Sequence, residues 1–192
     1  MIAGPRLVKQ MARRHICCLA GGLPMTEQNP DPAVVPASYA DGPAQLEAAM
    51  AGLTEAGLDM ALTAGTWTIR QYVHHVVDGD DIWSVYIKVA LGNPHAVFTL
   101  QWYWDIPQDR WAESWNYGRR AIDPSLALFH ANRRHIVQLV QGIAGSWELA
   151  ALLKRPNGQE VPITVGAVIE MQARHVTGHI EDIRAIRGRH QL

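Results

Sequence analysis

The sequence lacks the features that staple a fold covalently or carry it into a membrane. It has two cysteines, Cys17 and Cys18, and because they are neighbours the fold does not depend on a disulfide between distant elements. No apolar run approaches the ~18 to 20 residues needed to span a bilayer. The formal net charge is −1 and no basic stripe is present, which argues against nucleic-acid or acidic-membrane partners. We therefore expect a globular cytoplasmic protein.

The composition predicts one domain behind a short extension. The 192 residues are 48% hydrophobic and 18% charged, which is typical of a globular chain. Basic residues before the short apolar run 16–23 imitate a signal peptide, but the run contains Gly21 and Gly22 and no A-x-A-like cleavage site follows it. We predict a flexible extension over residues 1–30 and a single domain over residues 31–192.

Four helices are indicated by apolar periodicity and end signals. The first is expected from Pro43 to about residue 57. The third is expected to be capped by Asp123-Pro124 and to end near residue 142. The second begins after Thr68, where Thr68 and Gln71 have the spacing of a capping box, and ends near residue 91. The fourth is expected after Thr164 and ends near residue 187.

The remaining segments are less regular. Residues 152–163 predict a small hairpin around Asn157-Gly158, with Pro162 restricting its second strand to a sheet edge. Residues 95–120, which we call the Trp-rich segment, read as a long loop with a short helical turn, either a packed lid or a dimer contact. The predicted fold is all-α, a four-helix bundle with a small β-hairpin between the third and fourth helices.

Histidines on the second and fourth predicted helices are the candidate functional residues. His175 and His179 are one turn apart and share an apolar face. Such a pair can hold a cation, although without a neighbouring Glu it is by itself more typical of core histidines. On the second helix, periodicity places His75 at the edge of the core face and His74 about 100° away, among polar residues that we expect in solvent.

Three inward imidazoles make a particular kind of metal site. They leave a coordination position open, as in a catalytic zinc site rather than a closed structural one. Neutral imidazole also suits Ni²⁺ and other late divalent metals. We therefore expect a divalent metal, Zn or Ni, on His75, His175 and His179.

Several motifs together resemble a known family. WTIRQYVHHVVDGD at residues 67–80, YIKVAL at 86–91, RWAES at 110–114, DPSLAL at 123–128 and RHVTGHI at 174–180 are similar to the DinB/YfiT-like superfamily, its YfiT branch in particular. The similarity covers roughly residues 36–187. It implies a four-helix bundle with a divalent metal on the positions of His75, His175 and His179. The family often has Trp-His at Met171-Gln172 and a second histidine at Val176, and these departures indicate a different pocket wall.

The resemblance implies chemistry on small molecules but leaves alternatives open. A metal-dependent hydrolase would use water acidified by the metal toward a pKa of ~7. A thiol S-transferase would instead hold a low-molecular-weight thiol at the same position, and a non-catalytic metal- or ligand-binding bundle is the third alternative. Asp182 and Asp78 each lie one turn from a candidate ligand and could orient it or accept a proton. A solvated carboxylate is an equal alternative for Asp182 and the favoured one for Asp78, given their angles to the core. A homodimer is a further expectation.

Overall fold

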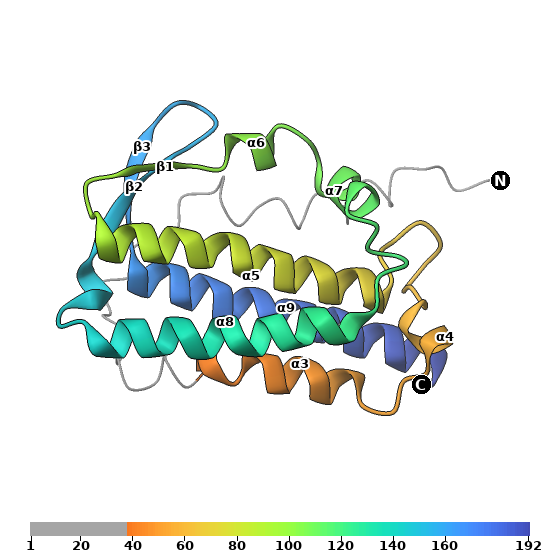
Figure 1. The fold of residues 1–192 in the computed structure, drawn as a ribbon. Coiled ribbons are helices and arrows are strands. Elements are labelled where there is room, and N and C mark those ends of the chain that lie inside the picture. Colours follow the sequence, from red (N-terminus) through yellow and green to blue (C-terminus); the bar gives the residue numbers. More distant parts are fainter. Residues whose placement is uncertain (1–37) are drawn as a thin grey trace. The chain divides into compact units, whose positions relative to one another are not determined.

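The computed structural model describes residues 38–192 (Figure 1). Its long elements are α3 (Gly42–Met50), α5 (Ile69–Gly92), α8 (Ile122–Gly142) and α9 (Val165–His190). Between them lie the short elements α4 (Glu55–Leu58), β1 (Val97–Thr99), α6 (Gln101–Trp104), α7 (Gln108–Ser114), the 3-10 helix η1 (Ser146–Glu148), β2 (Ala150–Lys154) and β3 (Glu160–Thr164). The predicted extension over residues 1–30 lies outside the described residues. No helix in residues 38–192 is long and apolar enough to cross a membrane.

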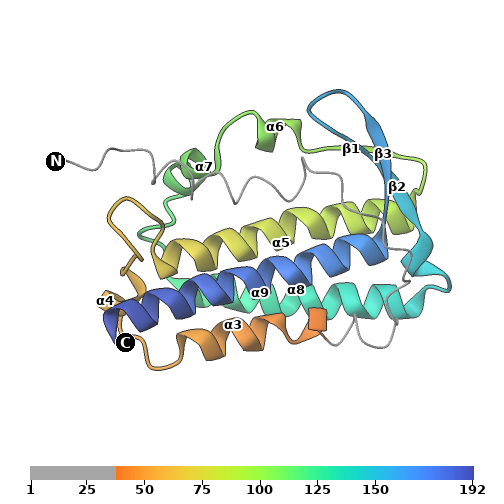
Figure 2. The ribbon, with the colours of Figure 1, turned by 180° about the vertical axis from the view of Figure 1, so that it is seen from behind.

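The four long helices form the predicted bundle. α5 packs against α8 and α9, and α3 packs against the same two helices. Figures 1 and 2 show α5 and α3 on opposite sides of the bundle, with α8 in front in the first view and α9 in front in the second. One flank of α5 therefore faces α8 and the other faces α9. This division decides where the two adjacent histidines of α5 lie.

The first predicted helix is interrupted. It was expected to continue to about residue 57, but α3 ends at Met50 and a separate turn, α4, begins at Glu55. Gly52 between them has φ +80°, a left-handed conformation that ends the helix and that glycine adopts without steric cost. Thr54 then starts α4, because its side chain accepts a hydrogen bond from the Gly57 backbone N–H.

The start of α5 agrees with the sequence prediction in detail. The Thr68 side chain accepts from the Gln71 N–H at 3.2 Å, and the Gln71 side chain accepts from the Thr68 N–H at 2.9 Å. Trp67 and Tyr72 pack edge to face with ring centroids 5.7 Å apart, which is the hydrophobic staple. α5 then continues to Gly92. These contacts fix the rotational position of the helix that carries His74 and His75.

The ends of the other two long helices differ slightly from expectation. α8 begins at Ile122 without a side-chain cap, so Asp123 lies inside its first turn rather than capping it. At this position its negative charge still interacts favourably with the positive end of the helix dipole. α9 is capped as predicted, with Thr164 Oγ1 accepting from the Ala167 N–H at 3.1 Å, but it continues to His190. Both differences are within the uncertainty of predicted boundaries.

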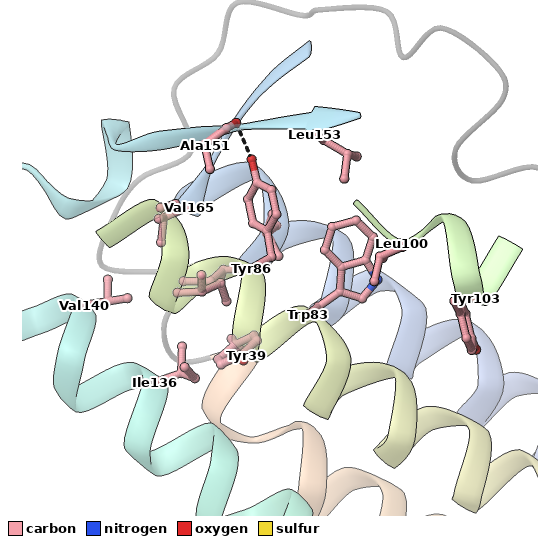
Figure 3. Packing of buried hydrophobic residues seen from close by; sticks show 14 residues of the cluster. Tyr39, Trp83, Tyr86, Leu100, Tyr103, Ile136, Val140, Ala151, Leu153 and Val165 are labelled. Carbon is pink, nitrogen blue, oxygen red and sulfur yellow. Dashed lines mark hydrogen bonds between the residues drawn. The ribbon is translucent and has the colours of Figure 1, made fainter. Parts of the chain in front are cut away.

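The predicted hairpin is present and is part of a three-stranded sheet. β2 and β3 are antiparallel, and Gly158 in their turn has φ +82°. Pro162 lies in β3, an edge strand, as expected. β1 was not predicted; it comes from the Trp-rich segment and pairs in parallel with β2, Val97 opposite Leu152. Tyr86 ties the sheet to α5 by donating its hydroxyl hydrogen bond to the Ala151 carbonyl oxygen at 2.6 Å (Figure 3).

Two apolar clusters fill the bundle, and an ion pair lies between them. The first cluster includes Trp83, Tyr86 and other residues near the sheet (Figure 3), and the second is built around Phe129 and the opposite halves of the helices. Arg133 of α8 and Asp80 of α5, both almost fully buried, approach to 2.8 Å. The Arg133 guanidinium also stacks 3.6 Å from the Tyr39 ring and 4.8 Å from the Phe129 ring. This pair joins α5 to α8 at mid-height of the bundle.

Candidate metal centre

Three histidine side chains from α5 and α9 converge in the structure. His75 comes from α5, and His175 and His179 come from successive turns of α9. The Nε2 atom of His175 lies 3.2 Å from Nε2 of His75 and 3.0 Å from Nε2 of His179. Their ligand atoms all lie within 4.8 Å of one another. No other three His, Cys, Asp or Glu side chains within residues 38–192 bring ligand atoms together in this way.

This geometry fits a tetrahedral divalent metal. Nitrogen ligands about 2.0 to 2.1 Å from zinc are separated by about 3.3 Å at tetrahedral angles. The two Nε2 separations measured here, 3.0 and 3.2 Å, are close to that value. The donor set is three neutral imidazoles, which suits Zn²⁺ and Ni²⁺. The residues present could therefore hold such an ion through their three Nε2 atoms.

Asp182 is placed to orient one of these rings. Its Oδ2 atom lies 3.0 Å from Nδ1 of His179, three residues earlier on α9. With Nδ1–H donating to the carboxylate, Nε2 of His179 is the unprotonated nitrogen, which is the form that a metal requires. Asp182 is half-buried and His179 is buried. The predicted role of Asp182 as an orienting residue thus has a contact to support it.

Aromatic side chains form a wall of the cluster. The Trp67 ring lies edge to face with His75 at 4.9 Å between centroids, and the Tyr72 ring lies 5.2 Å from that of His179. Burial, and to a smaller extent the charge of Asp182, raises the pKa of Tyr72 to about 12. The phenol is therefore neutral at physiological pH and can donate a hydrogen bond. The staple that begins α5 thus also shapes the site.

The prediction that His74 faces solvent is wrong. Its side chain is 0% exposed, and Nδ1 lies 2.9 Å from Ser125 Oγ while Nε2 lies 3.2 Å from the Arg120 carbonyl oxygen. The Tyr117 ring packs against it at 5.6 Å. Because a carbonyl only accepts, Nε2 carries the proton and Nδ1 accepts from the serine. Burial is the main cause that lowers the pKa of His74, so it remains a neutral structural residue.

Asp78 contacts Arg120, the residue whose carbonyl oxygen bonds His74: Arg120 Nη1 donates to Asp78 Oδ2 at 2.9 Å. Sequence reasoning did not single out Arg120, and no periodic pattern or spacing in its own stretch would have done so. The Arg120 carbonyl oxygen also accepts from Arg70 Nη1 at 3.2 Å. We call Asp78, His74, Ser125 and Arg120 the Arg120 network. It occupies the flank of α5 toward α8, whereas the histidine cluster occupies the flank toward α9.

Of the three positions where the chain departs from the family pattern, Met171 is half-buried and the other two lie inside the bundle. Gln172 is 2% exposed and Val176 is 1% exposed. The Gln172 carbonyl oxygen accepts from Arg133 Nη2 at 3.4 Å, and Val176 belongs to the second apolar cluster. Their substitutions therefore alter the core behind the histidines.

Comparisons with known proteins agree with this architecture. A protein of Bacillus cereus (strain 03BB102), named "Putative metal-dependent hydrolase", is 32% identical over 148 residues, which are 75% of this chain and 80% of that protein. A protein of the same name from Bacillus mycoides (strain KBAB4) is 28% identical over 145 residues, again 75% and 80% of the two chains.

A solved structure shows the same fold. YfiT from Bacillus subtilis, described as "a probable metal-dependent hydrolase with an unusual four-helix bundle topology", matches with a TM-score of 0.70 at 21% identity, over 82% of this chain and 86% of that one. The sequence model of the DinB superfamily matches residues 39–183, a span that includes all three histidines. This chain therefore belongs to the DinB superfamily.

Proposed function

We propose that this protein is a divalent-metal-dependent hydrolase of small molecules, with Zn²⁺ or Ni²⁺ held by His75, His175 and His179. The observation that carries the proposal is the convergence of three Nε2 atoms from two helices, with Asp182 fixing one ring. The names of the relatives support the same reaction class. When bound, the metal supplies a Lewis acid that makes water nucleophilic near neutral pH.

The protein side chains have separate roles in this proposal. Asp182 acts on the substrate only indirectly, because its carboxylate accepts the Nδ1 proton of His179 and so keeps that ring in one tautomer. Trp67 and Tyr72 exclude water from the ring faces of the histidines. Asp78, one helical turn after His75, is the carboxylate that can accept a proton, and it forms an ion pair with Arg120 at 2.9 Å.

Metal content and hydrolysis test the proposal together. His179→Ala should remove most of the bound metal and the hydrolysis of ester and amide substrates, while helicity by circular dichroism stays close to that of the native protein. The helices should survive because an open metal site need not supply folding energy. His135→Ala, which removes an exposed histidine of α8, is the matched control and should keep both properties.

The same measurements can defeat the proposal. Stoichiometric metal in His179→Ala, by elemental analysis, would put the site elsewhere. Unfolding of that variant would make the metal structural. Retained metal binding in the native protein with no hydrolysis, but with conjugation of a thiol to an electrophile, would replace the hydrolase by the transferase alternative.

A further inference from the structure

A cleft lies between α5 and the end of the Trp-rich segment. Its volume is about 210 Å³ and its lining residues are Asp78, Asp81, Ile82, Trp115 and Arg120. Asp78 follows His75 by three residues on one helix, so the two side chains are neighbours on its surface, about 4.5 Å apart along the axis. The cleft thus begins one helical turn from a candidate metal ligand.

The Trp-rich segment contributes both to the contacts around Trp67, which packs on His75, and to the lining of the cleft. Trp67 Nε1 donates to Asp109 Oδ1 of α7 at 3.0 Å, and the same Trp67 ring packs on His75. Further along the segment, Trp115 and Arg120 line the cleft. A molecule in the cleft would therefore lie between α5 and this segment, beside the helical turn that follows His75.

Arg120 is held rigidly at the cleft. Its carbonyl oxygen accepts from His74 and Arg70, while its guanidinium donates to Asp78 at 2.9 Å and to Ser125 Oγ at 3.3 Å. His74 and Ser125, which fix it, are both almost fully buried. Two of its five N–H donors are used in these bonds, and the other three make no hydrogen bond with residues 38–192. An arginine oriented in advance with donors to spare is suited to bind a carboxylate.

The cleft also carries an uncompensated negative charge. Asp78 is neutralised by its ion pair with Arg120. Asp81 has no such partner: its Oδ1 accepts from the Asn132 side-chain amide at 2.9 Å, a neutral donor that leaves the carboxylate charge in place. The Trp115 ring and Ile82 form the apolar part of the lining. A carboxylate beside an aromatic ring favours an ammonium group.

We propose that this cleft binds the charged head of a small amino-acid-like zwitterion, with its carboxylate on Arg120 and its ammonium group on Asp81. The volume of about 210 Å³ has room for several water-sized groups, which is enough for the charged head of a single amino acid. This inference rests on the proposed function, because it assigns the substrate class to the same site. The bond to be hydrolysed would then lie away from the charged head, toward His75.

Three matched probes test the assignment without turnover. L-leucine carries both charges, L-leucinamide only the ammonium group and 4-methylpentanoate only the carboxylate. Binding is followed by NMR titration of the metal-loaded protein at the Trp115 indole N–H signal, assigned with Trp115→Phe. We expect L-leucine to shift this signal and to bind at least about tenfold more tightly than either analogue.

Two variants separate the two contacts. Arg120→Gln should weaken L-leucine to the level of L-leucinamide and leave L-leucinamide unchanged. Asp81→Asn should weaken L-leucine to the level of 4-methylpentanoate and leave 4-methylpentanoate unchanged. Asp81 is exposed, so this second variant decides the question if Arg120→Gln fails to fold.

Several outcomes would overturn the inference. They are no shift of the Trp115 signal with L-leucine up to about 50 mM, equal binding of L-leucine and either analogue, and unchanged L-leucine binding in Asp81→Asn. The proposed hydrolase would survive each of these, because metal content and hydrolysis are measured separately. Conversely, probe binding that persists in His179→Ala would support the cleft even if the hydrolase proposal failed.

Discussion

His74 and His75 are neighbours in the chain, yet the two flanks of α5 give them different surroundings. His75 faces α9, is half-buried, and brings its Nε2 to a ring nitrogen of another histidine. His74 faces the start of α8 and the end of the Trp-rich segment, is fully buried, and has a hydroxyl on one nitrogen and a carbonyl on the other. His75 can therefore offer a nitrogen lone pair to a metal, whereas hydrogen bonds occupy both ring nitrogens of His74.

The largest expected effect comes from removing His75 from the histidine cluster. His75→Ala removes one of three imidazoles and should weaken metal binding at least about 100-fold. The fold should remain, since the surrounding core is apolar. Equilibrium metal titration and circular dichroism would measure both effects. Native-like metal affinity in His75→Ala would mean that His75 is not a ligand.

Asp182 tests whether a contact outside the three histidines supports them. Asp182→Ala frees Nδ1 of His179 and should weaken metal binding about 10- to 100-fold. Asp182→Asn keeps an accepting oxygen without the charge and should lose less affinity. Glu181→Ala, at the exposed neighbouring position, should change nothing. Equal affinities of the native protein and Asp182→Ala would show that Asp182 has no influence on the ligand.

His74→Ala should have the opposite effect to His75→Ala: it should lower stability and leave metal binding unchanged. The variant leaves the Ser125 hydroxyl without its acceptor, removes one of the two donors to the Arg120 carbonyl oxygen and opens a buried cavity, so the free energy of unfolding should fall by about 2 to 3 kcal/mol. Metal affinity should stay within about threefold of the native value, because Nε2 of His74 is bonded to a carbonyl. Urea denaturation of the metal-free proteins gives the first quantity. A loss of metal with no loss of stability would contradict the distinction between the two histidines.

Low pH should reduce the contribution that His74 makes to the stability of the fold. The pKa of His74 is lowered, mainly by burial, so the native state binds fewer protons there than the unfolded state does. Stability from this group is therefore present above the unfolded pKa of about 6.5 and decreases as the pH falls below it. His74→Gln should remove this component. Urea midpoints of the two proteins would accordingly converge between about pH 7 and pH 5, and parallel curves would refute the expectation.

Ser125→Ala should have the smallest effect. It deletes the hydroxyl that lies 2.9 Å from His74 Nδ1 and 3.3 Å from Arg120 Nη2, and should cost about 1 kcal/mol of stability with metal affinity unchanged. The size of the loss relative to that of His74→Ala would show how much of the Arg120 network depends on the hydroxyl. A loss equal to that of His74→Ala would mean that the network acts as a single unit.

The histidine doublet also shows how far the sequence could predict this protein. The phase of α5 correctly placed His75 inward, because a long apolar stripe and two end signals fix that helix. It failed for His74, since periodicity within α5 does not reveal which later segment will cover its polar side. Residues 117–125 come more than forty positions later, and their contact with His74 depends on tertiary packing alone.

Other successes and failures follow the same division. The caps at Thr68 and Thr164 and the turn at Gly158 were predictable because each involves residues within four positions. β1 was missed because it has three residues and its partner strand lies more than fifty positions away. The domain boundary at residue 30, the cytoplasmic location and the homodimer stay predictions.

The Trp-rich segment has a consequence for how this protein can diverge. It is fastened at its start, where β1 pairs with β2, and at its end, where Arg120 is bonded to α5. Between these points Tyr103 and Ala112 are buried, whereas residues 105–107 are exposed. The entropic cost of a longer loop grows only slowly with length. Insertions at residues 105–107 can therefore change the surface of this segment while the buried residues on either side and the three histidines stay in place. The fold thus separates a part free to vary from a part that must stay constant.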